Sequence, residues 1–212
     1  MNSTFSIKET YSKAWKAVKE NIWVLVGLLI GYTILSFTLS LLMGDSTTAS
    51  SMASIISIIL GSIFTLGYYR NIFQALDGEE PQFSAYGQES RKFLKYIGAS
   101  IIYAFIVIVG FALVIIPGIY LALRLQFYQA FIVDEDCGAI ESLKRSWEIT
   151  KDHAMELFLL GLVMILIIII GMLLFGVGIF IATPVIYAMY LIVYRILNSP
   201  VIVEEVKEAE EV

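Results

Sequence analysis

The chain has 212 residues, of which 58% are hydrophobic and 16% are charged, and its mean hydropathy is +0.82. Soluble domains are roughly 45–50% apolar and about 25% charged, so this composition excludes a water-soluble fold. The formal net charge is −5, and we expect no nucleic-acid partner.

Six apolar runs predict membrane-spanning helices. They cover residues 22–43, 52–69, 96–114, 119–133, 157–175 and 179–194. A hydrocarbon core of about 30 Å requires about 20 helical residues, and most of the runs suffice alone. The fourth run is short, so we expect a tight turn at residues 115–118, with Pro117-Gly118 as turn residues, to separate it from the third. The sequence therefore predicts an all-α integral membrane protein with six transmembrane helices.

A basic residue, any residue and a large aromatic precede each pair of apolar runs. The three copies are Lys13-Ala14-Trp15, Arg91-Lys92-Phe93 and Arg145-Ser146-Trp147. Tryptophan prefers the headgroup zone and basic residues favour anionic lipid, so these residues are the expected interfacial anchors. The pattern predicts three repeat units, residues 5–76, 83–133 and 139–196, each a helical hairpin preceded by an amphipathic interfacial helix, around a pseudo-threefold axis.

The first and third lead-in segments each carry an apolar stripe at helical spacing. The first stripe is expected to contain Ile7, Tyr11, Ala14, Trp15, Val18 and Ile22, and the third Ile140, Leu143, Trp147 and Thr150. Lipid can cover such stripes, but so can other protein segments if the lead-in helices pack together as cytosolic caps. A stripe alone does not distinguish the two cases.

The lysines and arginines predict the orientation. They cluster before the first run, between the second and third, between the fourth and fifth, and after the sixth. Under the positive-inside rule both termini and the two longer loops are cytoplasmic. Residues 1–198 form the expected membrane domain, and residues 199–212 an acidic, disordered cytoplasmic tail.

The stretch from residue 117 to residue 151 has the most distinctive sequence. It contains Pro117-Gly118-Ile119-Tyr120, Arg124, Phe127-Tyr128, Val133-Asp134-Glu135-Asp136, Gly138-Ala139-Ile140-Glu141-Ser142-Leu143, Ser146-Trp147 and Thr150-Lys151. It resembles a group of uncharacterised prokaryotic membrane proteins that includes the membrane domain of glycerophosphoryl diester phosphodiesterases. The resemblance implies a six-helix module in the prokaryotic cytoplasmic (inner) membrane. The soluble phosphodiesterase domain has no counterpart in this sequence, so none of its residues is carried over.

Arg124 is the leading candidate for a functional residue, because it falls about midway along the fourth run. A charged residue at that depth costs at least ~2.5 kcal/mol and normally faces the bundle interior. Tyr120, Arg124 and Tyr128 should share one helix face. The candidate ligand-binding residues are Arg124, Tyr120, Tyr128, Gln129, Tyr187 and Tyr190. Arg124 is expected either to bind an anionic headgroup or carboxylate, or to hydrogen-bond helix-end carbonyls or tyrosines of the sixth run and so fix packing.

The sequence lacks a metal-binding cluster, an activated nucleophile and a glycine-rich phosphate loop, so we expect no enzymatic activity, no metal and no cofactor. The favoured function is a lipid- or amphiphile-binding or membrane-organising module, with membrane lipids, including anionic ones, as partners. The alternative is a small-molecule or lipid transporter with a polar path at Arg124, and an intramembrane enzyme ranks third. A lateral opening between helices would favour lipid, and a water-filled cavity at Arg124 would favour transport. Small residues at Gly27, Gly31, Ala53, Ser57 and Gly61 suit helix contacts within one chain or in a homo-oligomer.

Overall fold

The computed structural model describes residues 4–42, 47–174 and 176–199, and all of its regular elements are helices. In chain order they are α1 (Ile7–Glu20), α2 (Ile22–Leu42), α3 (Thr47–Leu76), α4 (Ser84–Glu89), the 3₁₀ helix η1 (Ser90–Lys92), α5 (Phe93–Leu113), α6 (Ile115–Leu125), α7 (Tyr128–Glu135), α8 (Ala139–Ile149), α9 (Ala154–Leu173) and α10 (Gly178–Leu197). Apart from Ser199, the expected disordered tail lies outside the described residues.

Six helical segments are long and apolar enough to cross a membrane. They are Ile22–Leu41, Ser54–Leu76, Ser84–Leu113, Ile115–Glu135, Ala154–Leu173 and Gly178–Leu197. Each overlaps one of the six predicted runs, so the chain is a multi-pass integral membrane protein. The third segment starts before its predicted run, because α4 and η1 lead directly into α5.

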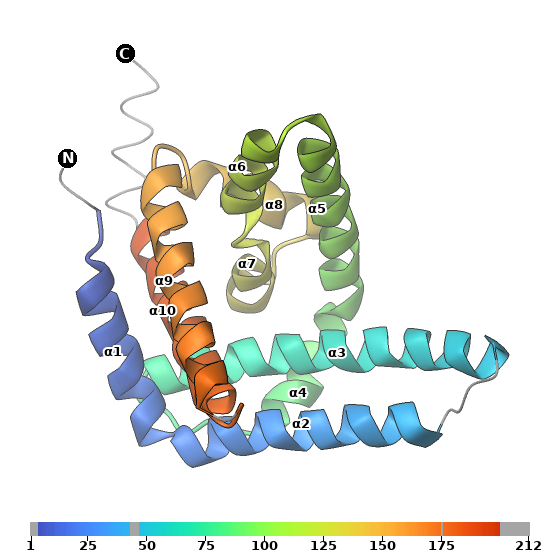
Figure 1. Ribbon diagram of the computed structural model, residues 1–212. Helices are drawn as coiled ribbons and strands as arrows, with labels where there is room; N and C mark the ends of the chain where they lie inside the picture. Colours follow the sequence, from blue (N-terminus) through green and yellow to red (C-terminus); the bar gives the residue numbers. More distant parts are fainter. Residues whose placement is uncertain (1–3, 43–46, 175, 200–212) are drawn as a thin grey trace.

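The core lies where the second half of α3, the short helix α7 and α10 meet. Figure 1 shows α2 and α3 side by side across the lower part of the molecule, α5 rising from α3, and α9 and α10 running together. Tyr194 of α10 joins the three parts of the core, because its ring contacts Phe73 of α3 and Phe131 of α7. All three side chains are buried. By contrast, α2 and α9 are largely exposed, as lipid-facing helices are.

The connection between α5 and α6 is tighter than predicted. The extended residue is Val114 alone, and α6 begins at Ile115. The hairpin turn therefore lies just before the predicted residues 115–118, and Pro117 and Gly118 are helical rather than turn residues. Pro117 lies in the first turn of α6, where a missing amide hydrogen costs nothing. Gly118 is required for contact rather than for turning, since a Cβ there would lie 2.5 Å from Cγ of the Phe111 ring.

The fourth candidate span is interrupted, which the sequence analysis did not predict. Helix α6 ends at Leu125 and α7 begins at Tyr128. The backbone groups of the break are satisfied by side chains, as a non-helical segment in a membrane requires. The Phe127 amide donates to the Ser146 hydroxyl at 3.0 Å, and the Tyr190 hydroxyl donates to the Gln126 carbonyl.

The lead-in helices α1 and α8 are amphipathic, but their buried faces differ from the predicted stripes. Helix α1 buries Thr10, Ala14 and Val18, and α8 buries Ser142, Leu143, Ser146 and Ile149. Tyr11, Trp15, Ile140 and Trp147 are exposed instead. Of the predicted stripes, Ala14, Val18, Leu143 and Thr150 are buried as expected, and small residues such as Ala14 and Ser146 allow close approach to neighbouring helices.

Candidate functional site

The Arg124 side chain is buried, with an exposed fraction of 4%, and it caps the end of helix α8. Its Nη2 donates to the Trp147 carbonyl at 2.5 Å, and its Nη1 donates to the Thr150 carbonyl at 3.3 Å. The guanidinium also lies over the Trp147 ring, 4.3 Å from the ring centroid. The last carbonyls of a helix lack intrahelical donors and carry partial negative charge. A buried arginine at this position supplies both the missing hydrogen-bond donors and a compensating positive charge.

The contact between α6 and α8 is reciprocal. The Arg124 carbonyl accepts hydrogen bonds from the Ser146 hydroxyl at 3.0 Å and from the Thr150 hydroxyl at 2.9 Å. Both terminal nitrogens of Arg124 are therefore used inside the protein. This is the arrangement expected if Arg124 fixes packing by binding helix-end carbonyls.

The other predicted ligand-binding residues divide into two groups. Tyr120 lies near the Arg124 guanidinium, with 5.7 Å between the guanidinium carbon and the ring centroid. Tyr128 lies after the helix break and contacts Ser100 and Gln129 instead. The expectation that Tyr120, Arg124 and Tyr128 share one continuous helix face is therefore wrong, because α6 ends between Arg124 and Tyr128.

Gln129 is the centre of a second, tyrosine-rich cluster. Its side-chain carbonyl accepts a hydrogen bond from the Tyr69 hydroxyl, and its amide donates to the Tyr128 hydroxyl at 3.0 Å. Tyr187 and Tyr190 pack edge-on against the Tyr69 ring. Hydrogen bonds between these groups satisfy polar atoms that would otherwise be costly to bury. The cluster links α3, α7 and α10 and lies apart from Arg124.

A buried ion cluster joins α3, η1 and α7. The Glu89 carboxylate binds Arg70 Nε at 2.9 Å and Lys92 Nζ at 2.8 Å. The Val133 carbonyl accepts hydrogen bonds from Arg70 Nη2 at 2.9 Å and from Lys92 Nζ at 2.6 Å. The side chains of Lys92 and Glu89 are only 3% and 5% exposed, against 30% for Arg70. Buried charges of this kind need close partners, and each has one here.

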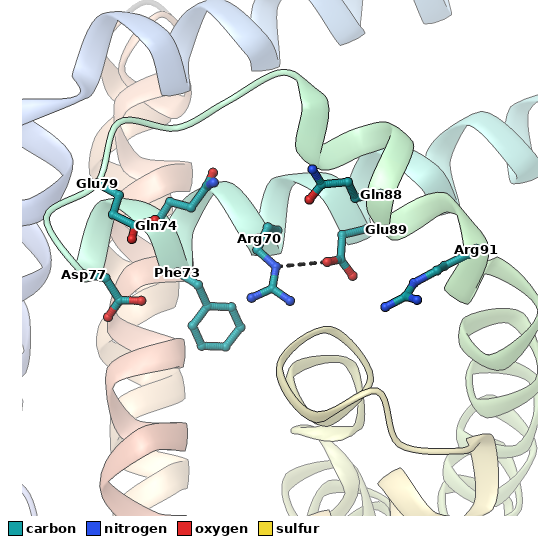
Figure 2. A pocket seen from close by; sticks show the side chains of 8 residues that line it. All are labelled: Arg70, Phe73, Gln74, Asp77, Glu79, Gln88, Glu89 and Arg91. Atoms are coloured by element: carbon teal, nitrogen blue, oxygen red, sulfur yellow. Dashed lines mark hydrogen bonds and ion pairs between the residues drawn. The ribbon is translucent and has the colours of Figure 1, made fainter.

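This ion cluster forms one wall of a polar pocket of about 710 Å³. Figure 2 shows the side chains that line it, and they are Arg70, Phe73, Gln74, Asp77, Glu79, Gln88, Glu89 and Arg91. They come from the end of α3, the connection to α4, α4 itself and η1. The Asp77 carboxylate is paired with both terminal nitrogens of Arg195, at 2.5 and 2.8 Å.

A second, apolar hollow lies along α2, α3 and the start of α4. Its volume is about 580 Å³. The lining residues are Trp23, Val24, Gly27, Leu28, Gly31, Tyr32, Leu35, Leu60, Ile63, Phe64, Phe83 and Tyr86, and we call this hollow the α2–α3 groove. Two of the lining residues, Tyr32 and Phe64, stack on each other with 4.0 Å between their ring centroids. Gly27 and Gly31 leave the groove open, because a Cβ at either would meet nothing within 4 Å.

The predicted interfacial anchors have different environments. Trp15 and Trp147 lie within α1 and α8 and are exposed, whereas Phe93 is the first residue of α5 and is half-buried. The three copies of the basic-aromatic pattern therefore differ in their place along a helix. Lys13 and Arg91 are exposed and line pockets.

Arg145, the third basic anchor, is paired within the protein. Both terminal nitrogens of its guanidinium hydrogen-bond the Glu135 carboxylate. Burial by itself would lower the pKa of Arg145, but the hydrogen bonds to Glu135 and Cys137 raise it above its ordinary value. Arg145 thus joins α8 to the end of α7.

Two of these features had only weak signals in the sequence. Arg70 directly follows the second apolar run and Lys92 lies inside the second basic-aromatic pattern, so both were visible as interfacial charges. Their shared partner Glu89 comes from a separate helix, and no local pattern connects it with Arg70. Gly27 and Gly31 were recognised as small residues suited to helix contacts, but not as the wall of a groove.

The comparisons with known proteins identify a family without a known activity. No curated protein and no solved structure matches the chain, so the resemblance to the phosphodiesterase membrane domain stays a prediction. A family model described as "Domain of unknown function (DUF7847)" matches residues 92–205, which is more than half of the chain. The matched region contains Lys92, Arg124 and Val133 but leaves out α1 to α4. The protein therefore belongs to the DUF7847 family.

Proposed function

We propose that the protein is a non-enzymatic membrane protein that binds a lipid or another amphiphile in the α2–α3 groove. The single observation that carries this proposal is the groove itself. Its lining residues come from the candidate spans Ile22–Leu41 and Ser54–Leu76 and from Phe83 and Tyr86 beside them. Its volume of about 580 Å³ falls within the range of roughly 300–1,000 Å³ typical of small-molecule sites.

The lining of the groove favours an acyl chain over a polar solute. Apolar and aromatic side chains predominate, and the two glycines expose only backbone and neighbouring side chains. Trp23 is 88% exposed and lies one residue after the start of α2, where an indole suits the headgroup zone. An amphiphile would place its chain between α2 and α3 and its polar end near Trp23.

A polar transport path at Arg124 has less support. The two terminal nitrogens of Arg124 donate to carbonyls of α8, and its guanidinium is covered by Trp147. A transported anion would have to displace these contacts. We therefore place the amphiphile site at the α2–α3 groove rather than at Arg124.

We further propose that the six long helices insert as three hairpins in a prokaryotic inner membrane, with both termini in the cytoplasm and α1, α4 and α8 at the cytoplasmic surface. Two glycine contacts support the hairpin arrangement. A Cβ at Gly110 would lie 3.0 Å from Cα of Gly118, and a Cβ at Gly171 would lie 3.0 Å from the backbone of Gly178. Close approach at small residues is typical of helix pairs in membranes.

The substitution Gly31→Leu tests the groove, because Gly31 lines it and a Cβ at this position meets nothing within 4 Å. We expect the variant to fold but to retain fewer phosphatidylglycerol molecules in native mass spectrometry after delipidation and re-addition of the lipid. Gly161→Leu on α9 is the matched control, since a Cβ at Gly161 also meets nothing within 4 Å. Equal lipid retention in both variants would contradict the proposal. A change in oligomeric mass with unchanged lipid retention would instead assign this face to a second copy of the chain.

A further inference from the structure

The charged pocket between α3 and η1, separate from the α2–α3 groove, holds more positive than negative charge at one end. Arg70 and Arg91 line that end together with a single carboxylate, that of Glu89, which the buried Lys92 also binds. Lys92 and Arg70 both bind that carboxylate, so its negative charge is already matched by two positive charges before Arg91 is counted. Figure 2 shows Arg91 on the opposite side of Glu89 from Arg70, with both guanidinium groups directed toward the pocket.

The available donors are those of the two arginines. Among residues 4–42, 47–174 and 176–199, the Arg91 guanidinium has no hydrogen-bond or ion-pair partner. Arg70 uses Nε and Nη2 on Glu89 and Val133, and its Nη1 has no partner in the same part of the chain. Free guanidinium nitrogens in a concave site fit the planar or tetrahedral oxygens of a carboxylate or phosphate.

The other end of the pocket limits the charge of a ligand. Glu79 is unpaired there within the described chain, while Asp77 is neutralised by Arg195. A second anionic group near Glu79 would be repelled. Gln74 and Gln88 add neutral hydrogen-bonding groups, and the Phe73 ring gives an apolar surface between the two ends.

We propose that this pocket binds a molecule with one phosphate or carboxylate group, which Arg70 and Arg91 hold, and with an uncharged or cationic remainder directed toward Glu79. The site is distinct from the α2–α3 groove and does not depend on the proposed function. Lys92 and Glu89 position Arg70 for this role, and Arg91 is the residue that touches only the ligand. A soluble phosphate compound and a phospholipid headgroup share this chemistry.

The test uses the full-length protein in dodecyl maltoside, a detergent without phosphate. Melting temperature is measured alone, with inorganic phosphate, and with phosphatidylethanolamine in mixed micelles. A ligand that binds only the folded state raises the melting temperature. We expect Arg91→Gln to keep the basal melting temperature, since the side chain is exposed and has no ion pair or hydrogen bond to the described residues. We expect the same variant to weaken ligand binding roughly tenfold or more.

Lys144→Gln is the matched control, because it removes one exposed positive charge on α8 outside the pocket. A phosphate-induced increment that Arg91→Gln loses and Lys144→Gln keeps supports a soluble ligand. The same pattern with phosphatidylethanolamine alone supports a lipid headgroup. If neither addition stabilises the wild type, or if Arg91→Gln retains the full increment, the proposal is overturned. Should Arg91→Gln not fold, Arg91→Lys and Gln88→Ala are tested in its place. Lysine lacks the planar fork of arginine. If both variants keep the full ligand-induced increment in melting temperature, the proposal is overturned.

Discussion

Arg124 shows how one buried residue can join two helix ends, those of α6 and α8. It binds carbonyls of α8, stacks on Trp147, and offers its own carbonyl to Ser146 and Thr150. A guanidinium suits this role because it has several donors in a fixed plane and stays charged. The same geometry leaves its terminal nitrogens committed to the protein, which argues against a role in ligand binding.

Replacing Arg124 with methionine should therefore destabilise the protein whether or not lipid is present. The variant keeps much of the apolar stem but loses the two charge-assisted hydrogen bonds to the Trp147 and Thr150 carbonyls. These carbonyls then keep the Thr150 hydroxyl and the His153 amide as donors, each at 3.3 Å, and we expect a cost of about 1–3 kcal/mol. Melting temperature in detergent, with and without phosphatidylglycerol, measures the effect. The lipid-induced increment should be equal in wild type and variant. A smaller increment in Arg124→Met would assign the arginine to lipid binding instead.

Cys137, the single cysteine of the chain, reports on the junction between α7 and α8. Burial raises the pKa of its thiol, and the hydrogen bond from Arg145 only partly opposes this. Since the thiolate is the reactive form, we expect slow alkylation by N-ethylmaleimide at pH 7 and faster alkylation as the pH rises. Mass spectrometry should show complete labelling at pH 7 only after denaturation in dodecyl sulfate. Rapid labelling of the folded protein at pH 7 would show that this junction is open.

At the scale of elements, contacts between helices depend on residues that have almost no side chain. Gly171 and Gly178 bring the end of α9 and the start of α10 into backbone contact. Gly161, also on α9, faces open space. Of these two glycines in α9, only Gly171 must lack a side chain, because only Gly171 lies against a neighbouring helix.

This difference predicts opposite outcomes for the same substitution. A Cβ at Gly171 would lie 3.0 Å from the carbonyl carbon and oxygen of Gly178, and backbone atoms cannot easily move, so Gly171→Ala should destabilise by about 1–3 kcal/mol. Gly161→Ala should be neutral or stabilise by up to about 1 kcal/mol, because alanine favours a helix over glycine. Thermal or dodecyl-sulfate unfolding of the two variants decides the matter. Equal losses would show that α9 and α10 do not approach each other at Gly171.

At the scale of the whole molecule, orientation follows from charge. Apart from Arg124, the lysines and arginines precede α2, lie in residues 70–95 and 144–151, or stand at positions 195 and 207. None occurs in the short connections at residues 43–46, 114 and 174–177. The positive-inside rule therefore predicts that these connections lie on the side opposite to both termini.

Reporter fusions test this topology directly. A fusion at Thr47 should report from the outer side of the membrane and one at Val212 from the cytoplasm, with an alkaline phosphatase and a fluorescent-protein reporter used in parallel. The same side for both positions would refute the arrangement of three hairpins.

What the sequence determined by itself is local. The lengths of the apolar runs predicted six membrane-spanning segments, and the spacing of apolar and basic residues predicted the amphipathic helices α1 and α8, because both properties depend on neighbours within a few turns. The break between α6 and α7 was not predictable in this way, since it depends on hydrogen bonds from Ser146 and Tyr190. The partners of Arg124 and the gathering of Arg70, Glu89 and Lys92 likewise come from residues on different helices. Only the tertiary structure shows these contacts. In a low-dielectric interior a polar group needs a partner that is close in space, and that partner can lie far away along the chain.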